Sequence, residues 1–214
     1  MKIFPAILEK DWQEIEAKIK LARVFSNVIH VDVIDSVSSK TPTFLDPRPF
    51  AEYTKDLFFE VHFITEDPLS YLEEFAKAGF RRFIAQIEKV KDQEEFIAKG
   101  EEFGEVGFAI DDQTPLSKII VDLFDLDALL VMTVKAGESG QEFKEENLGK
   151  VKDLKNLILA KSIPSLIIGV DGGVNKETIT DIKKGGADFV VANSAIFNGN
   201  PPENYKELLS LSTE

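Results

Sequence analysis

Eight short runs rich in Val, Ile and Phe alternate along this chain with longer segments in which apolar residues recur at helical spacing. This alternation is typical of parallel strands joined by helical crossovers. The predicted strands are residues 3–8, 28–34, 58–64, 82–87, 106–110, 128–133, 166–170 and 189–192. The predicted helices are residues 12–23, 68–78, 93–103, 115–123, 147–161 and 176–184, and the pattern is weakest at 46–53.

The order of these elements defines the expected fold class. Eight strand–helix alternations within 214 residues favour an α/β fold of the (β/α)8 TIM-barrel type, with an open doubly wound sheet as the structural alternative. No G-x-G-x-x-G follows the first strand, which weakens the dinucleotide-binding version of that alternative. No Pro/Gly/Ser-rich linker divides the chain, so we predict one barrel domain over residues 1–214.

Composition excludes several partners. The formal charge of −13 disfavours contact with nucleic acids and with anionic lipid surfaces. No apolar run approaches the ~20 residues that span a bilayer, and the first residues do not resemble a secretory signal. The sequence contains no Cys, so any metal must be bound by imidazole and carboxylate groups. We expect a cytoplasmic protein that acts on a small molecule.

Both histidines of the chain lie within apolar strand runs. His30 and Asp32 are two residues apart and project from the same strand face. His62 lies near the end of the next strand, and Asp171 ends the seventh. Functional groups of a (β/α)8 barrel gather at the C-terminal ends of its strands, so these four residues can converge on one divalent metal ion, Zn, Fe, Mn or Co. The alternative is that His30 and Asp32 only satisfy each other in the core.

Glycines in the late loops indicate a site for a phosphate group. Gly137 and Gly140 follow the sixth strand, Gly172 and Gly173 follow the seventh, and Asn193 with Ser194 follows the eighth. Backbone N–H groups in these loops bind phosphate in many barrels. Each glycine taken singly is equally well explained as an ordinary turn residue.

Seven segments, in order along nearly the whole chain, resemble the motifs of the ribulose-phosphate 3-epimerase family: residues 4–8, 30–35, 61–63, 131–134, 140–143, 170–174 and 192–197. The resemblance implies a ribulose-phosphate-binding barrel that epimerises a ketose phosphate, by default D-ribulose 5-phosphate to D-xylulose 5-phosphate. It implies that His30, Asp32, His62 and Asp171 bind the catalytic metal. It further implies that Asp32 and Asp171 serve as acid and base through an enediolate, and that the protein is a homo-oligomer of carbohydrate metabolism. The expected substrate- and phosphate-binding residues are Met132, Gly137, Gly140, Gln141, Gly172, Gly173, Asn193 and Ser194.

Departures from the family pattern surround the expected substrate rather than the expected metal. Ala6 stands where Ser is usual, Gln86 where His is usual, and Asn193 where Gly is usual. Ile34 and Ile64 replace methionines of an apolar cap. The loops at residues 36–41 and 135–139 also differ from the family's, and Glu138 brings a carboxylate to the expected phosphate loop. The substrate is therefore less defined than the metal.

Three other functions compete with pentose phosphate epimerisation. A hexulose 6-phosphate 3-epimerase could explain the changed loops. The phosphate-binding decarboxylases and aldol-type synthases share the fold, but Ile34 occupies the Lys position of their D-x-K-x-x-D pattern, which disfavours them. A barrel that binds a sugar phosphate without turnover is the third alternative, although two buried carboxylates and two histidines are costly to retain without a ligand.

Overall fold

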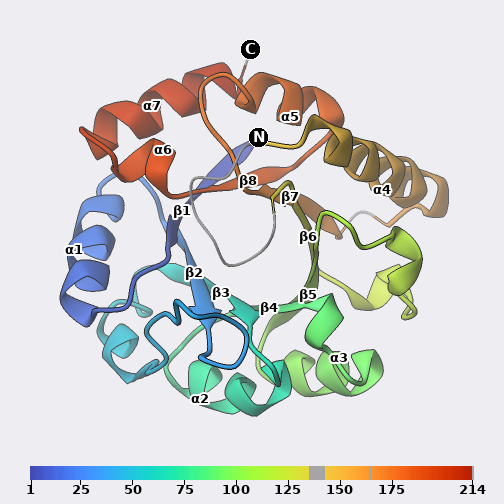
Figure 1. Ribbon diagram of the computed structural model, residues 1–214, viewed down its shortest axis with the longest axis horizontal. Helices are drawn as coiled ribbons and strands as arrows, with labels where there is room; N and C mark the ends of the chain where they lie inside the picture. Colours follow the sequence, from blue (N-terminus) through green and yellow to red (C-terminus); the bar gives the residue numbers. More distant parts are fainter. Residues whose placement is uncertain (135–142, 164, 214) are drawn as a thin grey trace.

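The computed structural model describes residues 1–134, 143–163 and 165–213, and its centre is a closed barrel of eight parallel strands in sequential order. The first and last strands pair with each other, which closes the barrel (Figure 1). The strands are β1 (Lys2–Ile7), β2 (Val28–Ile34), β3 (Phe58–Ile64), β4 (Arg82–Gln86), β5 (Glu105–Ile110), β6 (Ala128–Met132), β7 (Ile167–Asp171) and β8 (Phe189–Ala192). The predicted (β/α)8 fold is confirmed, and the open sheet is excluded.

Two groups of buried side chains account for the nearly continuous apolar runs of the strands. A larger core lies between the strands and the surrounding helices, with Phe59, Phe83 and Phe108 among its members. A smaller cluster contains alternate residues of single strands, such as Phe4 and Ala6 of β1. Strands that bury both faces read as unbroken hydrophobic runs, which is why the sequence pattern located them well.

Helices and short 3-10 turns surround the barrel (Figure 1). The α-helices are α1 (Trp12–Ala22), α2 (Leu72–Lys77), α3 (Gln93–Glu101), α4 (Leu148–Lys161), α5 (Ile179–Gly185), α6 (Ser194–Phe197) and α7 (Pro201–Leu211). The 3-10 helices are η1 (Arg48–Glu52), η2 (Pro68–Tyr71), η3 (Ile87–Lys89), η4 (Leu116–Lys118), η5 (Leu123–Asp125) and η6 (Glu145–Asn147). The poorly defined segment 46–53 is thus largely a 3-10 helix, and the predicted helix 68–78 divides into η2 and α2.

The predicted helix at residues 115–123 is wrong. The structure has the short turns η4 and η5 there, with an extended backbone at Ile119 between them. Ile119, Ile120 and Val121 form a β-branched run, which disfavours a helix. The Gln93 side chain donates to the Lys118 carbonyl oxygen at 2.8 Å and accepts from the Ile120 N–H at 3.0 Å. The Gln93 side chain thus satisfies one backbone C=O and one backbone N–H group of the segment, as a paired strand would, and holds its backbone extended.

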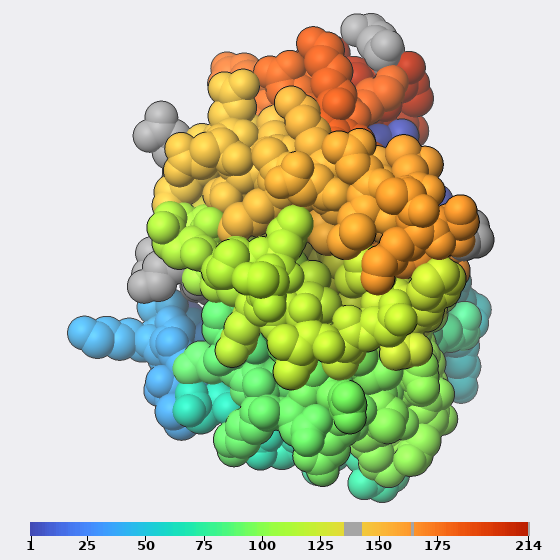
Figure 2. Space-filling model, turned by 90° about the vertical axis from the view of Figure 1, so that its right-hand side faces the viewer, coloured from blue at the N-terminus to red at the C-terminus, as the bar shows by residue number. Residues whose placement is uncertain are grey.

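The side of the molecule seen in Figure 2 is formed by α3 at the bottom, the segment between β5 and β6 in the middle, and α4 and α5 above it. At the left edge of that view, the light-blue segment after β2 projects beyond the rest of the surface. Val37 in this segment is 72% exposed. Among the residues that the structure describes, no helix combines the length and apolar character needed to cross a membrane.

Candidate metal centre and active site

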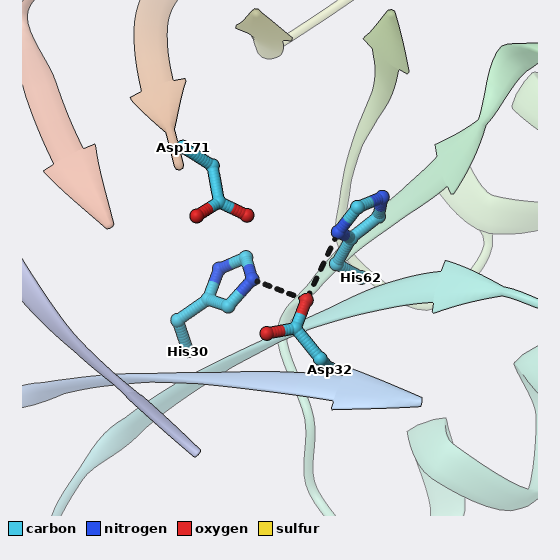
Figure 3. Close-up of side chains that lie close together, drawn as sticks. All are labelled: His30, Asp32, His62 and Asp171. Carbon is cyan, nitrogen blue, oxygen red and sulfur yellow. Dashed lines mark hydrogen bonds and ion pairs between the residues drawn. The ribbon is translucent and has the colours of Figure 1, made fainter. Parts of the chain in front are cut away.

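Three strands bring the predicted metal ligands to one place. His30 and Asp32 lie on β2, His62 on β3 and Asp171 at the end of β7. Asp32 is in register with His62, so these two side chains share the inward face that alternation also assigns to His30. Asp171 reaches the same point from β7, and its carboxylate points toward the other three side chains (Figure 3).

The four side chains are close enough to share one ion. One potential ligand atom from each lies within 4.8 Å of the corresponding atoms of the others. Asp32 Oδ1 is 3.2 Å from His30 Nε2 and 3.0 Å from His62 Nδ1 (Figure 3). Both imidazoles are fully buried, while Asp171 is partly exposed. Two nitrogens and two carboxylates with one accessible side are a donor set that suits Zn, Fe, Mn or Co.

Each imidazole has a second partner on the side away from this cluster. His30 Nδ1 is 2.6 Å from Glu60 Oε1, and Glu60 Oε2 accepts from Arg82 at 2.5 Å. His62 Nε2 is 2.9 Å from Gln86 Oε1, and the Gln86 amide nitrogen donates to a Glu88 oxygen at 2.7 Å. The outer nitrogen of each ring is therefore occupied, and the inner nitrogens face Asp32.

The sequence prediction missed Glu60 and Arg82. The indication available in the sequence was the Glu within the apolar run 58–64, two residues before His62 and therefore on the same strand face. In the sequence, Gln86 stands out only as a departure from the family pattern. Its place next to His62 depends on the alignment of β3 with β4, in which His62 is opposite Ile84.

The electrostatics of the cluster separate the two aspartates. Burial raises the pKa of Asp32, but the charge and hydrogen bonds of His30, followed by those of His62, outweigh burial and leave the Asp32 pKa below its usual range. Burial and then the negative charge of Asp32 raise the pKa of Asp171 to about 7. Burial lowers the pKa of His30, but Asp32 and Glu60 outweigh it and raise that pKa well above its usual value. Two carboxyl groups with pKa values pushed apart are suited to act as base and acid.

The predicted phosphate residues are only partly described. Gly137, Gly140 and Gln141 lie outside the described residues. Gly172 and Gly173 follow Asp171 directly and have φ values of 106° and 61°. Residues other than glycine rarely adopt such backbone angles. A Cβ atom on Gly172 would also lie 2.4 Å from a methyl group of Val134. Backbone geometry thus accounts for both glycines, and it leaves their phosphate role a prediction.

The remaining predicted substrate residues surround the same end of the barrel. Met132 is buried and in register with Asp171. Ser194 begins α6, and Asn193 precedes it at the end of β8. Asn193 Oδ1 accepts a hydrogen bond of 3.0 Å from Lys18 of α1, which also pairs with Glu9. Lys18 places a cation beside the β8 loop, and no local sequence pattern indicated this contact.

Together, the closed barrel and the His/Asp cluster at its C-terminal strand ends define a (β/α)8 barrel enzyme, because active sites of this fold lie at that end. Its fold resembles the structure of KGPDC from Streptococcus mutans in complex with D-R5P, with a TM-score of 0.72, 12% identity and coverage of 99% of this chain and 96% of that one. Residues 2–197 match the model of the ribulose-phosphate 3 epimerase family. The chain belongs to the ribulose-phosphate 3-epimerase family.

Curated relatives agree with this assignment. The ribulose-phosphate 3-epimerase of Schizosaccharomyces pombe is 34% identical over 94% of this chain and 89% of its own length. The cytoplasmic isoform of Oryza sativa subsp. japonica is 31% identical over 100% of this chain and 94% of its own length. The predicted family is therefore confirmed, and the decarboxylase and aldol-synthase alternative has lost its support.

Proposed function

We propose that this protein is an isomerase that catalyses the metal-dependent 3-epimerisation of a ketose phosphate, with D-ribulose 5-phosphate and D-xylulose 5-phosphate as the default pair. The observation that carries the proposal is the approach of Asp32 and Asp171, from β2 and β7, to one cluster with His30 and His62. Family membership supports the same reaction.

The residues of the cluster fit a single divalent ion, Zn, Fe, Mn or Co. His30 Nε2 and His62 Nδ1 both lie close to Asp32 Oδ1. The two nitrogen atoms and the carboxylate could therefore coordinate the same ion. We propose that these three residues and Asp171 hold the ion. When bound, it would supply the positive charge that stabilises the negative charge developing on the substrate oxygens.

The two aspartates carry the proton transfer. Epimerisation next to a ketone requires removal of a C–H proton from one face of the carbon and delivery of a proton to the other face. Asp32 and Asp171 project from different strands, so a substrate carbon between them would present opposite faces to the two carboxyl groups. We propose that they exchange the base and acid roles with the direction of reaction, through an enediolate of the substrate.

The phosphate group is expected to bind at the loops after β6, β7 and β8. The supporting observation is that Ser194, at the start of α6, is exposed directly after β8. Lys18 donates to Asn193 beside the β8 loop, but its charge is paired with Glu9. In a chain whose net charge is −13, the backbone N–H groups of these loops are therefore the proposed donors to the phosphate.

The test is proton NMR of D-ribulose 5-phosphate in D2O with metal-loaded protein. Exchange of the C3 proton with deuterium and formation of xylulose 5-phosphate are expected, and both should be lost in the Asp171→Asn and Asp32→Asn proteins. The metal content of each variant must be measured, because both aspartates are proposed ligands. Full activity of the Asp171→Asn protein would refute the two-aspartate mechanism.

The same assay separates the alternatives. Exchange with a hexulose 6-phosphate such as fructose 6-phosphate, and none with the pentulose, would indicate a hexulose 6-phosphate 3-epimerase. Metal-loaded protein that binds a ketose phosphate without any exchange would indicate a non-catalytic binding barrel. A homo-oligomer, a cytoplasmic location and a single domain remain predictions, of which the location is supported by the name of the rice relative.

A further inference from the structure

A row of buried charges leads from the metal cluster toward the opposite end of the barrel. Glu60 on β3 is fully buried and lies in register with His30 on one side and Arg82 on the other. Arg82 is 8% exposed and also pairs with Glu105 of β5 at 2.6 Å. The epimerisation chemistry does not use Glu60, and a buried carboxylate is costly unless it is paired. The role of Glu60 must therefore lie in its contacts with His30 and Arg82.

The contacts of Glu60 define which nitrogen of His30 carries a proton. A guanidinium group can only donate hydrogen bonds, so Glu60 Oε2 must accept from Arg82 at 2.5 Å. An ionised carboxylate only accepts, so its other oxygen, 2.6 Å from His30 Nδ1, requires a proton on Nδ1. In the neutral ring, the lone pair is then on Nε2, which is the atom that faces Asp32.

Arg82 restricts the orientation of the Glu60 carboxylate. It is held between Glu60 and Glu105, and its guanidinium lies over the Phe58 ring at 5.2 Å from the ring centre. Because both carboxylates and the ring fix the guanidinium, the Glu60 carboxylate has little freedom to rotate. The Glu60 carboxylate therefore fixes the orientation of the His30 ring through its contact with Nδ1.

We propose that Glu60, oriented by Arg82, is a positioning residue that holds His30 in the tautomer whose Nε2 is free to bind the metal ion. This inference rests on the proposed metal centre. Outer carboxylates that accept a hydrogen bond from a ligating imidazole commonly strengthen metal binding, and their loss typically costs about 10–100-fold in affinity.

The test compares Glu60→Gln with Glu105→Gln. Both substitutions remove one negative charge next to Arg82, but only Glu60 contacts His30. In the Glu60→Gln protein, Arg82 must face the amide oxygen, so the amide NH2 group faces His30 Nδ1. That contact makes Nδ1 an acceptor and moves the proton to Nε2, where it competes with the metal.

The readout is the affinity of each folded protein for Zn²⁺, measured by competition with a chromophoric chelator well below the unfolding temperature. We expect the Glu60→Gln protein to bind Zn²⁺ about 10–100-fold more weakly than the unsubstituted protein, and the Glu105→Gln protein to bind it equally well. Equal affinity in all three proteins would overturn the positioning role, even if the Glu60→Gln protein were less stable. Failure of the unsubstituted protein to bind Zn²⁺ would instead contradict the metal centre itself.

A second measurement needs no substitution, in case the Glu60→Gln protein does not fold. The chain contains only two histidines, so 1H–15N spectra of the Zn²⁺-loaded protein contain two sets of imidazole signals. We expect a proton on Nδ1 of His30 and a metal-bound Nε2. A protonated Nε2 with Nδ1 bound to the metal would overturn the inference.

Discussion

Replacement of Gly169 by Ala tests how tightly β7 is packed against the neighbouring strand. Gly169 is in register with Phe189 of β8. A Cβ atom at this position would lie 2.2, 2.4 and 2.7 Å from three atoms of the Phe189 ring. Carbon atoms in favourable contact are separated by about 3.5–4.0 Å, so the ring would have to move by about 1 Å or more.

The surroundings of Phe189 leave little room for that movement. Its side chain is fully buried, and its ring stacks on that of Phe4 with 4.7 Å between the ring centres. Added volume in a well-packed core typically costs about 1–3 kcal/mol. At about 2–4 °C per kcal/mol for a chain of this size, Gly169→Ala should lower Tm by about 2–12 °C. Gly169 precedes Asp171 by two residues on the same strand face, so we also expect slower turnover.

Thermal unfolding followed by circular dichroism is a suitable assay, and Gly149→Ala is the matched control. Nothing lies within 4 Å of a Cβ atom at Gly149 in α4, so that substitution should be neutral or should stabilise by up to about 1 kcal/mol. Adding Phe189→Leu to Gly169→Ala should recover part of the loss, because it removes the clashing ring atoms. Equal stability of the Gly169→Ala and unsubstituted proteins would refute this account of the packing.

Two further predictions concern the charged groups. In the metal-free protein, stability should fall by a few kcal/mol as the pH rises from about 4 to about 7. The pKa of Asp171, raised to about 7, keeps this carboxyl group protonated in the folded chain over a range in which it is ionised in the unfolded chain, so the folded state loses stability as the pH rises. His30, whose pKa is also raised, adds a loss in the same direction as the pH rises through its folded-state value. Unfolding temperatures with EDTA and with Zn²⁺ check this, and a chelated protein that became more stable over that range would contradict it. Separately, Arg82→Met leaves the Glu60 carboxylate buried with one partner fewer, so urea unfolding should show a loss of about 3–5 kcal/mol, and a loss below about 1 kcal/mol would count against a tightly coupled pair.

Local patterns in the sequence were sufficient for the strands and for the candidate ligands. The runs at residues 28–34 and 58–64 coincide with β2 and β3, because a strand buried on both faces has a hydrophobic signature that needs no knowledge of its neighbours. The two-residue spacing of His30 and Asp32 likewise placed them on one face. The convergence of His62 and Asp171 followed from the rule that strand ends meet at one end of a barrel.

The contacts that complete the site depend on alignment between strands and on packing between distant residues. Glu60 reaches His30 only because β2 and β3 pair in one particular register, and a shift by one residue would turn its side chain to the other face. Lys18 and Asn193 are 175 residues apart in sequence. The extended segment that replaced the predicted helix at residues 115–123 is held by the side chain of Gln93, more than 20 residues earlier. Hydrogen bonds between such distant groups leave no periodic trace in the sequence, so only the folded chain could reveal them.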